Sequence, residues 1–241
     1  MKLYVLSLGR YAVDARILDA SVSGRTSVPV WALLIRHEQG NLLFDLGCAA
    51  EDPALTAGPD ETLEVQLASL GMTAVDIEMA VISHLHGDHF GALPLLTHAD
   101  VYVPREDWTA ALTYVFERAD RRQGALWERL MLPVRTYRPI RVGEDFELMR
   151  GVRVLTLPGH TASLLGLDVS VGGRRLIFPS DSVYSPVNFE RLPGACLDAQ
   201  AYERSRKRLR ALEREGGEIV YSHWTAQFER LPKAPHPLAE D

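Results

Sequence analysis

The stretch Ser83-His84-Leu85-His86-Gly87-Asp88-His89 places three imidazoles and one carboxylate within six residues. It directly follows the apolar run 79–82, whose composition predicts a buried strand. The cluster should therefore lie where a strand ends and a loop begins. We expect Gly87 to let the chain turn there, so that the side chains on both sides of it face one cavity. Imidazole and carboxylate groups bind zinc and related metals, so this spacing predicts a metal site.

Further ligand-type side chains stand directly after other predicted strands, namely Asp45, His160, Asp181 and His223. Taken singly, each is a common structural residue, and Asp45 in particular can be an ordinary turn residue. A sheet presents its strand ends along one rim, so these loops can meet the histidine cluster, and their shared placement favours a common site. The role predicted for Asp45 is to hydrogen-bond a metal-bound histidine and so set its tautomer.

The remaining pattern predicts a β-rich chain with helices between groups of strands. Strands are expected at residues 2–8, 30–35, 42–44, 79–82, 101–103, 146–149, 152–157, 165–171, 175–179 and 218–222. Helices are expected from an Asp60 cap to Gly71, along the apolar stripe from Trp108 to Ala119, around Trp127 and at 199–214. Residues 17–29, rich in Ser, Gly and Thr, predict a long loop, and residues 232–241 predict an extended tail.

The composition indicates a protein with a substantial apolar core. The chain has 241 residues, 46% of them hydrophobic, and no linker divides it, so we expect one domain over residues 1–241. Its net charge of −6 argues against a nucleic-acid partner.

Cysteine usage and the N-terminus bear on the compartment. Cys48 and Cys196 lie far apart in the sequence, which favours free thiols in a reducing compartment. The apolar run 3–8 is short and lacks a cleavage site after it, and no segment reaches the length of a membrane span. We therefore expect a cytoplasmic protein with no membrane partner.

Residues 84–89 resemble the H-x-H-x-D-H signature of the metallo-β-lactamase superfamily. Pro158-Gly159-His160-Thr161, Asp181 and His223 follow in the family's order and roughly its spacing, so the resemblance spans nearly the whole chain. It implies an α+β fold, a four-layer αβ/βα sandwich of the metallo-β-lactamase type. In that fold two sheets face each other, helices cover their outer faces, and a dinuclear metal site lies at one edge.

The resemblance also implies a role for each ligand-type side chain. The first metal would be bound by His84, His86 and His160, the second by Asp88, His89 and His223, with Asp181 as the bridge between them. The implied cofactors are two divalent metal ions. Zn²⁺ is the default for such ligands, and cobalt, manganese and iron remain alternatives because sequence does not determine which metal is loaded.

Within the superfamily the chain is most similar to the quorum-quenching N-acyl homoserine lactone lactonases. The residues that carry this similarity are 28–31, 181–184 and 188–190. The similarity implies a metal-dependent lactonase in which a metal-bridging hydroxide attacks the lactone carbonyl. Tyr184 would donate a hydrogen bond to the developing oxyanion, and Asp88 would carry a proton to the leaving alkoxide. The implied partner is a small-molecule lactone, and the implied state is a monomer or homodimer.

Three departures from the lactonase pattern leave every proposed ligand in place. Gly87 stands where those lactonases often have a bulky aromatic residue, residues 161–164 lack the usual Pro-Gly-His, and Trp224 stands where Asp is common. The change at Gly87 predicts a more open substrate pocket.

Two alternative functions stay open. Hydrolysis of another lactone or ester, such as a pyridoxolactone, would use the same site. A metal-binding module without turnover would keep the ligands, although Tyr184 argues against it. A β-lactamase is disfavoured because no Lys or Arg stands beside Asp181 or His223 to bind the substrate's carboxylate. A nuclease is disfavoured because the chain shows no basic groove or extra domain.

Overall fold

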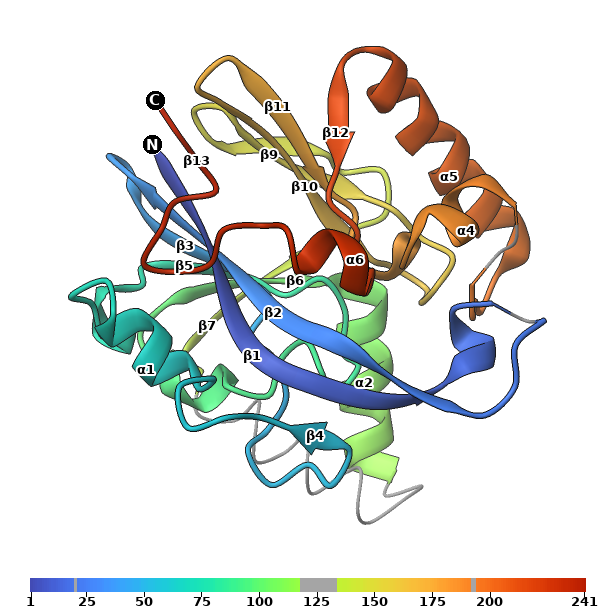
Figure 1. The fold of residues 1–241 in the computed structure, drawn as a ribbon, viewed down its shortest axis with the longest axis horizontal. Coiled ribbons are helices and arrows are strands. Elements are labelled where there is room, and N and C mark those ends of the chain that lie inside the picture. The colour runs from blue at the N-terminus through green and yellow to red at the C-terminus, as the bar shows by residue number, and fades with distance from the viewer. Residues whose placement is uncertain (20, 118–133, 192–193) are drawn as a thin grey trace.

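The strands of the protein form two sheets that lie face to face, and helices cover the outer side of each sheet (Figure 1). The structure is a computed structural model and describes residues 1–19, 21–117, 134–191 and 194–241. The predicted four-layer αβ/βα sandwich of the α+β class is confirmed.

The first sheet combines an antiparallel N-terminal half with a parallel half. Its strands are β1 (Lys2–Asp14), β2 (Arg25–His37), β3 (Gly40–Phe44), β4 (Leu55–Thr56), β5 (Met79–Val81), β6 (Asp100–Pro104), β7 (Thr136–Ile140) and β13 (Ala239–Glu240). The order is β13-β1-β2-β3-β5-β6-β7, and β4 also pairs with β1. Strands β3, β5, β6 and β7 run parallel to one another. The C-terminal residues therefore lie beside the N-terminus (Figure 1).

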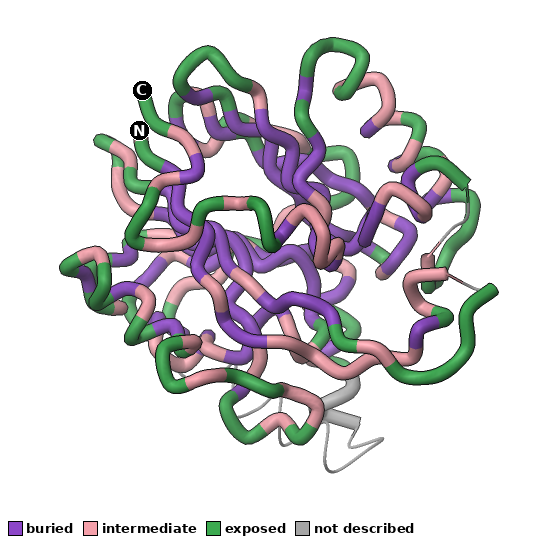
Figure 2. Tube along the Cα trace, in the orientation of Figure 1, coloured by how far each residue is buried: buried purple, intermediate pink, exposed green. Residues whose placement is uncertain are grey.

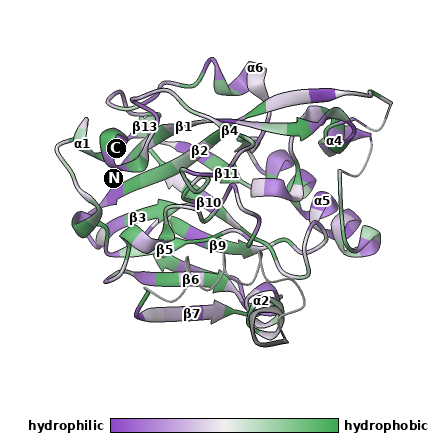
Figure 3. Cartoon of the chain, turned by 90° about the horizontal axis from the view of Figure 1, so that it is seen from below, coloured by the Kyte–Doolittle hydropathy of each residue, from purple (hydrophilic) through white to green (hydrophobic). Residues whose placement is uncertain are grey.

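One prediction about this sheet is wrong, and one of its strands was missed. Residues 25–29 belong to β2 and not to a long loop, because they pair with residues 10–14 of β1 and the ladder hydrogen bonds override the polar composition. Strand β7 was not predicted because Pro139 interrupts its pattern. At the edge of the sheet a proline removes no necessary ladder bond, and β7 is visibly paler, hence less hydrophobic, than β6 beside it (Figure 3).

The second sheet is mostly antiparallel and agrees closely with prediction. Its strands are β8 (Phe146–Met149), β9 (Val152–Thr156), β10 (Leu165–Val171), β11 (Arg174–Phe178) and β12 (Gly217–Ile219), in the order β12-β11-β10-β9-β8. Gly172 and Gly173 turn the chain between β10 and β11, both with positive φ, as the Gly-Gly hairpin signal predicts. Strand β12 pairs with β11 in parallel.

The helices pack on the outside of the two sheets. They are α1 (Leu63–Ala68), α2 (Arg105–Glu117), α4 (Pro186–Glu190), α5 (Ala199–Arg214) and α6 (Thr225–Phe228), with 3-10 turns at Ala15–Ile17, Ala74–Asp76, Leu93–Leu95 and Ser180–Ser182. Helix α5 has the predicted bounds. Helix α1 begins at Thr62, whose side chain accepts from Val65 N, and not at the predicted Asp60 cap. The helical piece predicted around Trp127 lies outside the described residues.

Three apolar clusters hold the four layers together, and the buried residues gather along the strands (Figure 2). One lies between the sheets, one under α1 and α2, and one under α5. Members of the three clusters are, in turn, Val5, Leu33, Val154 and Leu167; Leu6, Leu34, Leu67 and Ala111; and Leu155, Ile177 and Leu209. Each fully buried aliphatic side chain contributes roughly 1.5–3 kcal/mol, so these contacts determine how the two sheets face each other.

The edge at which the parallel strands end is where the ligand-type residues gather. Strands β3 and β5 are parallel, so they end on the same side of the first sheet. Strands β9 and β11 are both antiparallel to β10, and β12 is parallel to β11, so all three end together. Leu165 N donates to Ser83 O at 2.8 Å, which joins the two sheets at this edge.

The cysteines and the helices bear on two further expectations. Cys48 and Cys196 are both free thiols, as predicted. Within the described ranges, none of the helices combines the length and apolar character that crossing a bilayer requires.

Candidate metal centre

The structure brings all seven predicted ligands together at this edge, in two adjacent groups. His84, His86, His160 and Asp181 form one group, and Asp88, His89 and His223 form the other; in each group, one potential ligand atom per residue lies within 4.8 Å of the others. This is the division that the resemblance implied, with Asp181 placed in the first group. That these side chains bind metal remains a prediction, and the fit of a metal follows from their geometry.

Three imidazole nitrogens converge in the first group. His86 Nδ1 lies 2.9 Å from His84 Nε2 and 3.0 Å from His160 Nε2. A neutral imidazole has one N–H and one lone pair. His86 Nδ1 can therefore satisfy at most one of its two neighbours by a hydrogen bond.

Asp181 lies between the two groups. Its Oδ2 is 3.7 Å from His84 Nε2, 3.5 Å from His160 Nε2 and 3.6 Å from His89 Nε2. Its Oδ1 is 3.1 Å from His223 Nε2. One carboxylate thus reaches histidines of both groups, which is the placement that a bridging ligand needs.

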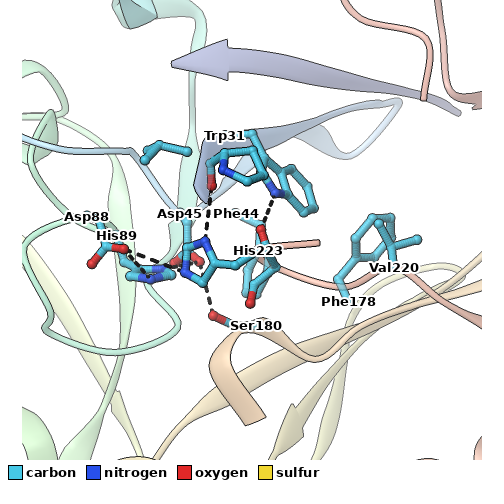
Figure 4. Close-up of a pocket in the computed structure, with 12 residues that line it drawn as sticks. Trp31, Phe44, Asp45, Asp88, His89, Phe178, Ser180, Val220 and His223 are labelled. Carbon is cyan, nitrogen blue, oxygen red and sulfur yellow. Dashed lines mark hydrogen bonds and ion pairs between the residues drawn. The ribbon is translucent and has the colours of Figure 1, made fainter. Parts of the chain in front are cut away.

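Four imidazoles turn Nδ1 away from the cluster and toward an oxygen. His160 Nδ1 lies 2.7 Å from Ala195 O. His223, labelled in Figure 4, has its Nδ1 3.0 Å from Pro29 O. A carbonyl oxygen only accepts, so both nitrogens carry the proton and donate it. In the neutral form Nε2 then keeps its lone pair toward the cluster, the arrangement typical of metal-binding histidines.

Asp45 supports the histidine loop from the end of β3. Its carboxylate accepts from Ser83 N at 2.8 Å, from Ser83 Oγ at 2.9 Å and from His89 Nδ1 at 2.8 Å. Ser83 Oγ uses its proton on Asp45, so His84 Nδ1, 3.0 Å away, donates to it. Ser180 Oγ also donates to Ser83 Oγ, at 2.8 Å. The structure therefore shows the predicted contact between Asp45 and a histidine of the site, which is His89 (Figure 4).

Backbone strain is concentrated in the same place. Asp45 has φ 59° and Ser180 has φ 48°, and they are the two non-glycine residues with positive φ in the described part of the chain. Such a conformation costs about 1–3 kcal/mol and persists only when surrounding contacts hold it. Here those contacts are the buried hydrogen bonds among Asp45, Ser83 and Ser180.

The two groups differ in charge. Burial, with the neighbouring imidazoles, lowers the pKa of His84 well below its usual range and lowers the pKa of His86 to about 4. Both are therefore neutral at pH 7, with a lone pair available. In the second group burial opposes ionisation, but His89 lowers the pKa of Asp88 to about 2. Burial likewise disfavours a charged His89, yet Asp88, Asp181 and Asp45 raise its pKa well above the usual range. The surroundings of the second group therefore favour positive charge.

Two buried atoms at the centre have no hydrogen-bond partner among the described residues, His89 Nε2 and Asp181 Oδ1. Although His223 Nε2 is close to Asp181 Oδ1, the two do not make an aligned hydrogen bond. Buried polar atoms without partners are costly. A metal cation would fit here for three reasons. Imidazole lone pairs converge on the site, a carboxylate oxygen has no partner, and the surroundings favour positive charge. This His/Asp cluster is therefore suited to two metal ions.

Tyr184, the predicted oxyanion donor, lies beside the cluster and is 2% exposed. Its ring centroid is 5.6 Å from that of His160 and 5.8 Å from that of His223. Its hydroxyl is 3.0 Å from His160 Nδ1 and 3.5 Å from Ala195 O. Its contact with a substrate remains a prediction.

Glycines on either side of the centre have different reasons to be there. Gly159 has φ 137°, and a Cβ there would lie 2.3 Å from the backbone of Tyr202, so the approach of α5 requires glycine before His160. Gly87 does not have a φ in the left-handed region, and a Cβ there would find ordinary contact distances. The expectation that the turn needs a glycine at residue 87 is therefore wrong.

The sequence assigned no role to several residues that support the site. Trp31 Nε1 donates to Ser222 O at 2.7 Å, next to His223 (Figure 4). Residues 28–31 contributed to the family resemblance, but the sequence predicted no role for Trp31 or Pro29 individually. Ser83 and Ser180 adjoin predicted ligands, which was the available signal. Ala195 acts through its backbone carbonyl, which no side-chain pattern reveals.

Comparison with known proteins places this site among related ones. The family model described as "Metallo-beta-lactamase superfamily" matches residues 25–223. The chain is 28% identical to the N-acyl homoserine lactonase AiiB of Agrobacterium fabrum, over 97% of each chain. It is 26% identical to an N-acyl homoserine lactonase of Bacillus thuringiensis, over 91% of each. A solved N-acyl homoserine lactone hydrolase, with the product N-hexanoyl-L-homoserine at its catalytic metal centre, superposes with a TM-score of 0.85 at 24% identity, covering 98% of each chain.

Proposed function

Because the chain belongs to the metallo-β-lactamase superfamily, we propose that it is a dinuclear metal-dependent lactonase whose substrates are N-acyl homoserine lactones. The observation that carries the proposal is the convergence of seven His and Asp side chains in two groups that share Asp181. The names of the relatives support the choice of substrate. We also propose that residues 1–241 act as one domain, since both sheets contribute ligands.

The proposed ligands are those that the resemblance implied. His84, His86 and His160 would hold one ion, Asp88, His89 and His223 the other, and Asp181 both. Zinc suits nitrogen and oxygen ligands, with cobalt, manganese and iron as alternatives. Two bound divalent ions would polarise the lactone carbonyl and lower the pKa of a water molecule to about 7, so that hydroxide is available at neutral pH.

The chain's own residues would then move protons and stabilise charge. Burial, and then the charge of Asp181, raises the pKa of Tyr184, so its hydroxyl stays protonated. We assign it a hydrogen bond to the substrate's carbonyl oxygen, which becomes negative as the nucleophile adds to the carbonyl carbon and before the ring C–O bond breaks. Asp88 is ionised, so it can accept the proton lost by the attacking water and pass it to the leaving alkoxide. The product is the open hydroxy acid, and no acyl-enzyme forms.

The proposal is tested with purified protein loaded with zinc. We expect close to two metal ions per chain by elemental analysis. We also expect acid release in a weakly buffered solution of N-hexanoyl homoserine lactone, followed by pH-stat titration. Full loading without turnover of any lactone or ester would favour the alternative of a metal-binding module. If the protein hydrolyses other lactones or esters but no N-acyl homoserine lactone, the alternative of a different lactone or ester hydrolase would be favoured.

A further inference from the structure

Among the described residues, the candidate metal centre is most exposed at His86. Five of its seven side chains are at most 8% exposed, namely His84, His89, His160, Asp181 and His223. Asp88 is of intermediate exposure, and His86 is exposed. Since His86 is exposed and Gly87 and Asp88 are of intermediate exposure, we take the approach of a substrate to be past these three residues, and the side chains around Gly87 then border the entrance.

The side chain that adjoins Gly87 is Asp52, from the loop between β3 and β4. A Cβ built at residue 87 would lie 3.7 Å from Asp52 Oδ2, and this is the one described atom within 4 Å of it beyond the neighbouring residues. Since Gly87 has no side chain, nothing at residue 87 covers the Asp52 carboxylate, and Asp52 is of intermediate exposure. A bulky aromatic side chain at residue 87 would lie against this carboxylate.

Asp52 is held in place by two hydrogen bonds. Its Oδ1 accepts from Ala54 N at 2.9 Å, and its Oδ2 accepts from the Tyr11 hydroxyl at 3.4 Å. Burial, followed by Asp52 and Asp88, raises the pKa of Tyr11 to about 12, so its hydroxyl is protonated at neutral pH and acts as the donor. A carboxylate offers about four acceptor positions, and these two bonds leave others available.

We propose that Asp52 is a specificity-determining residue that accepts the N–H of a nitrogen substituent on the lactone ring, with Tyr11 as its positioning residue. The inference rests on the proposed lactonase function and adds the residue of this chain that would recognise the nitrogen substituent of its substrate. A carboxylate disfavours a substrate group that cannot donate a hydrogen bond. Such a group displaces water from the carboxylate without replacing the hydrogen bond that the water made. The negative charges of Asp52 and Asp88 also disfavour substrates with an anionic group near the ring.

The test compares two lactones of equal size. One is N-hexanoyl homoserine lactone, and the other has CH₂ in place of its amide N–H. With zinc-loaded protein we expect kcat/KM to favour the amide by about 10- to 100-fold, the usual range for one hydrogen bond to a charged group. In Asp52→Ala this preference should disappear, mainly through KM for the amide, while kcat/KM for the CH₂ analogue stays within about threefold. Asp52→Asn keeps an acceptor for Ala54 N and should retain part of the preference. Tyr11→Phe should reduce it less.

Matched variants keep the result decisive. Asp60→Ala changes an exposed carboxylate in the next loop, between β4 and α1, and should keep the full preference. Gly87→Phe should reduce the preference by covering Asp52, and zinc content and melting temperature verify that each variant is folded. Hydrolysis of homoserine lactone, which carries a free ammonium group, is measured as well. It shows whether Asp52 recognises an amino group or only an acylamino group. If both lactones are hydrolysed and Asp52→Ala and Asp52→Asn keep the original preference, this inference is overturned and the lactonase stands. If the unaltered protein hydrolyses neither, the lactonase proposal fails and this inference with it.

Discussion

The two halves of the metal centre are built in different ways. The early half draws His84, His86, Asp88 and His89 from one short loop after β5. The late half draws His160, Asp181 and His223 from the ends of three different strands of the second sheet. The supports differ as well. Side chains of Asp45 and Ser83 hold the early loop, whereas main-chain carbonyls orient two of the three late residues.

This difference has a consequence for substitutions. The early half depends on one buried network, so a single change at Asp45 should affect two histidines together. The residues of the late half are held by separate tertiary contacts, so a substitution at one of them should disturb that residue alone. Asp181 is the exception, because it reaches both groups. The largest effect of a substitution should therefore occur at the residue that joins the two halves.

Asp181→Ala should have the largest effect, because it removes the carboxylate shared by the two groups. Loss of a supporting residue around a metal already costs 10- to 100-fold, so loss of this ligand should cost more than about 100-fold in lactone turnover. Elemental analysis should find metal content below two per chain. Asp168→Asn, which alters a carboxylate paired with Arg175 in the second sheet, is the control. Full metal content in Asp181→Ala would show that the halves do not share this ligand.

Asp45→Asn should act on the early half alone. Asn tolerates the positive φ and still accepts from Ser83 N. Its NH₂ group, however, cannot accept the proton of His89 Nδ1, which disturbs the tautomer of that imidazole. Metal affinity measured by competition with a chelator should fall about 10- to 100-fold. Unchanged affinity would mean that the network is only structural.

Tyr184→Phe should slow turnover and leave metal binding intact. Removing one oxyanion donor costs on the order of 100-fold in kcat, and we expect a loss of about this size. Steady-state kinetics and metal analysis on the same sample check both parts. A fall in metal affinity instead would assign the hydroxyl to orienting His160, which lies 3.0 Å away.

Asp145→Asn should have the smallest effect on the site and a measurable one on stability. Asp145 accepts from Thr156 N in β9 and pairs with Arg208 of α5. Burial opposes ionisation, but Arg208 lowers the pKa of Asp145 below its ordinary value of 3.8. The stabilisation is therefore present at neutral pH and is lost as pH falls below about 3.8.

The measurement for Asp145→Asn is urea unfolding at several pH values. The variant should be less stable than the unaltered protein by about 1 kcal/mol at pH 7, since Arg208 is partly exposed. The difference should shrink toward pH 3, while metal content at pH 7 stays unchanged. An equal difference at both pH values would show that the ionised form of Asp145 is not the stabilising one.

Much of the fold was predictable because its core strands carry strong apolar patterns. Helix α5 and the second sheet were predicted almost to their bounds. The failures among the strands share one cause, which is tertiary pairing that overrides local composition. Residues 25–29 look like a loop but gain a partner strand, and β7 contains a proline that only its edge position tolerates.

The candidate site shows the same limit. The early half could be recognised from spacing alone, and the late residues from their places after strands. Their supports could not, because the carbonyls of Pro29 and Ala195 come from distant segments. The prediction that the turn uses the freedom of Gly87 failed because residue 87 has no left-handed φ and has room for a Cβ.

The most direct test of the account is anomalous diffraction from crystals of the zinc-loaded protein at the zinc absorption edge. We predict two peaks about 3.5–4 Å apart. One should lie within about 2.2 Å of nitrogens of His84, His86 and His160, the other equally close to ligand atoms of Asp88, His89 and His223, and both should be near Asp181. A single peak, or peaks away from these side chains, would contradict a shared dinuclear centre.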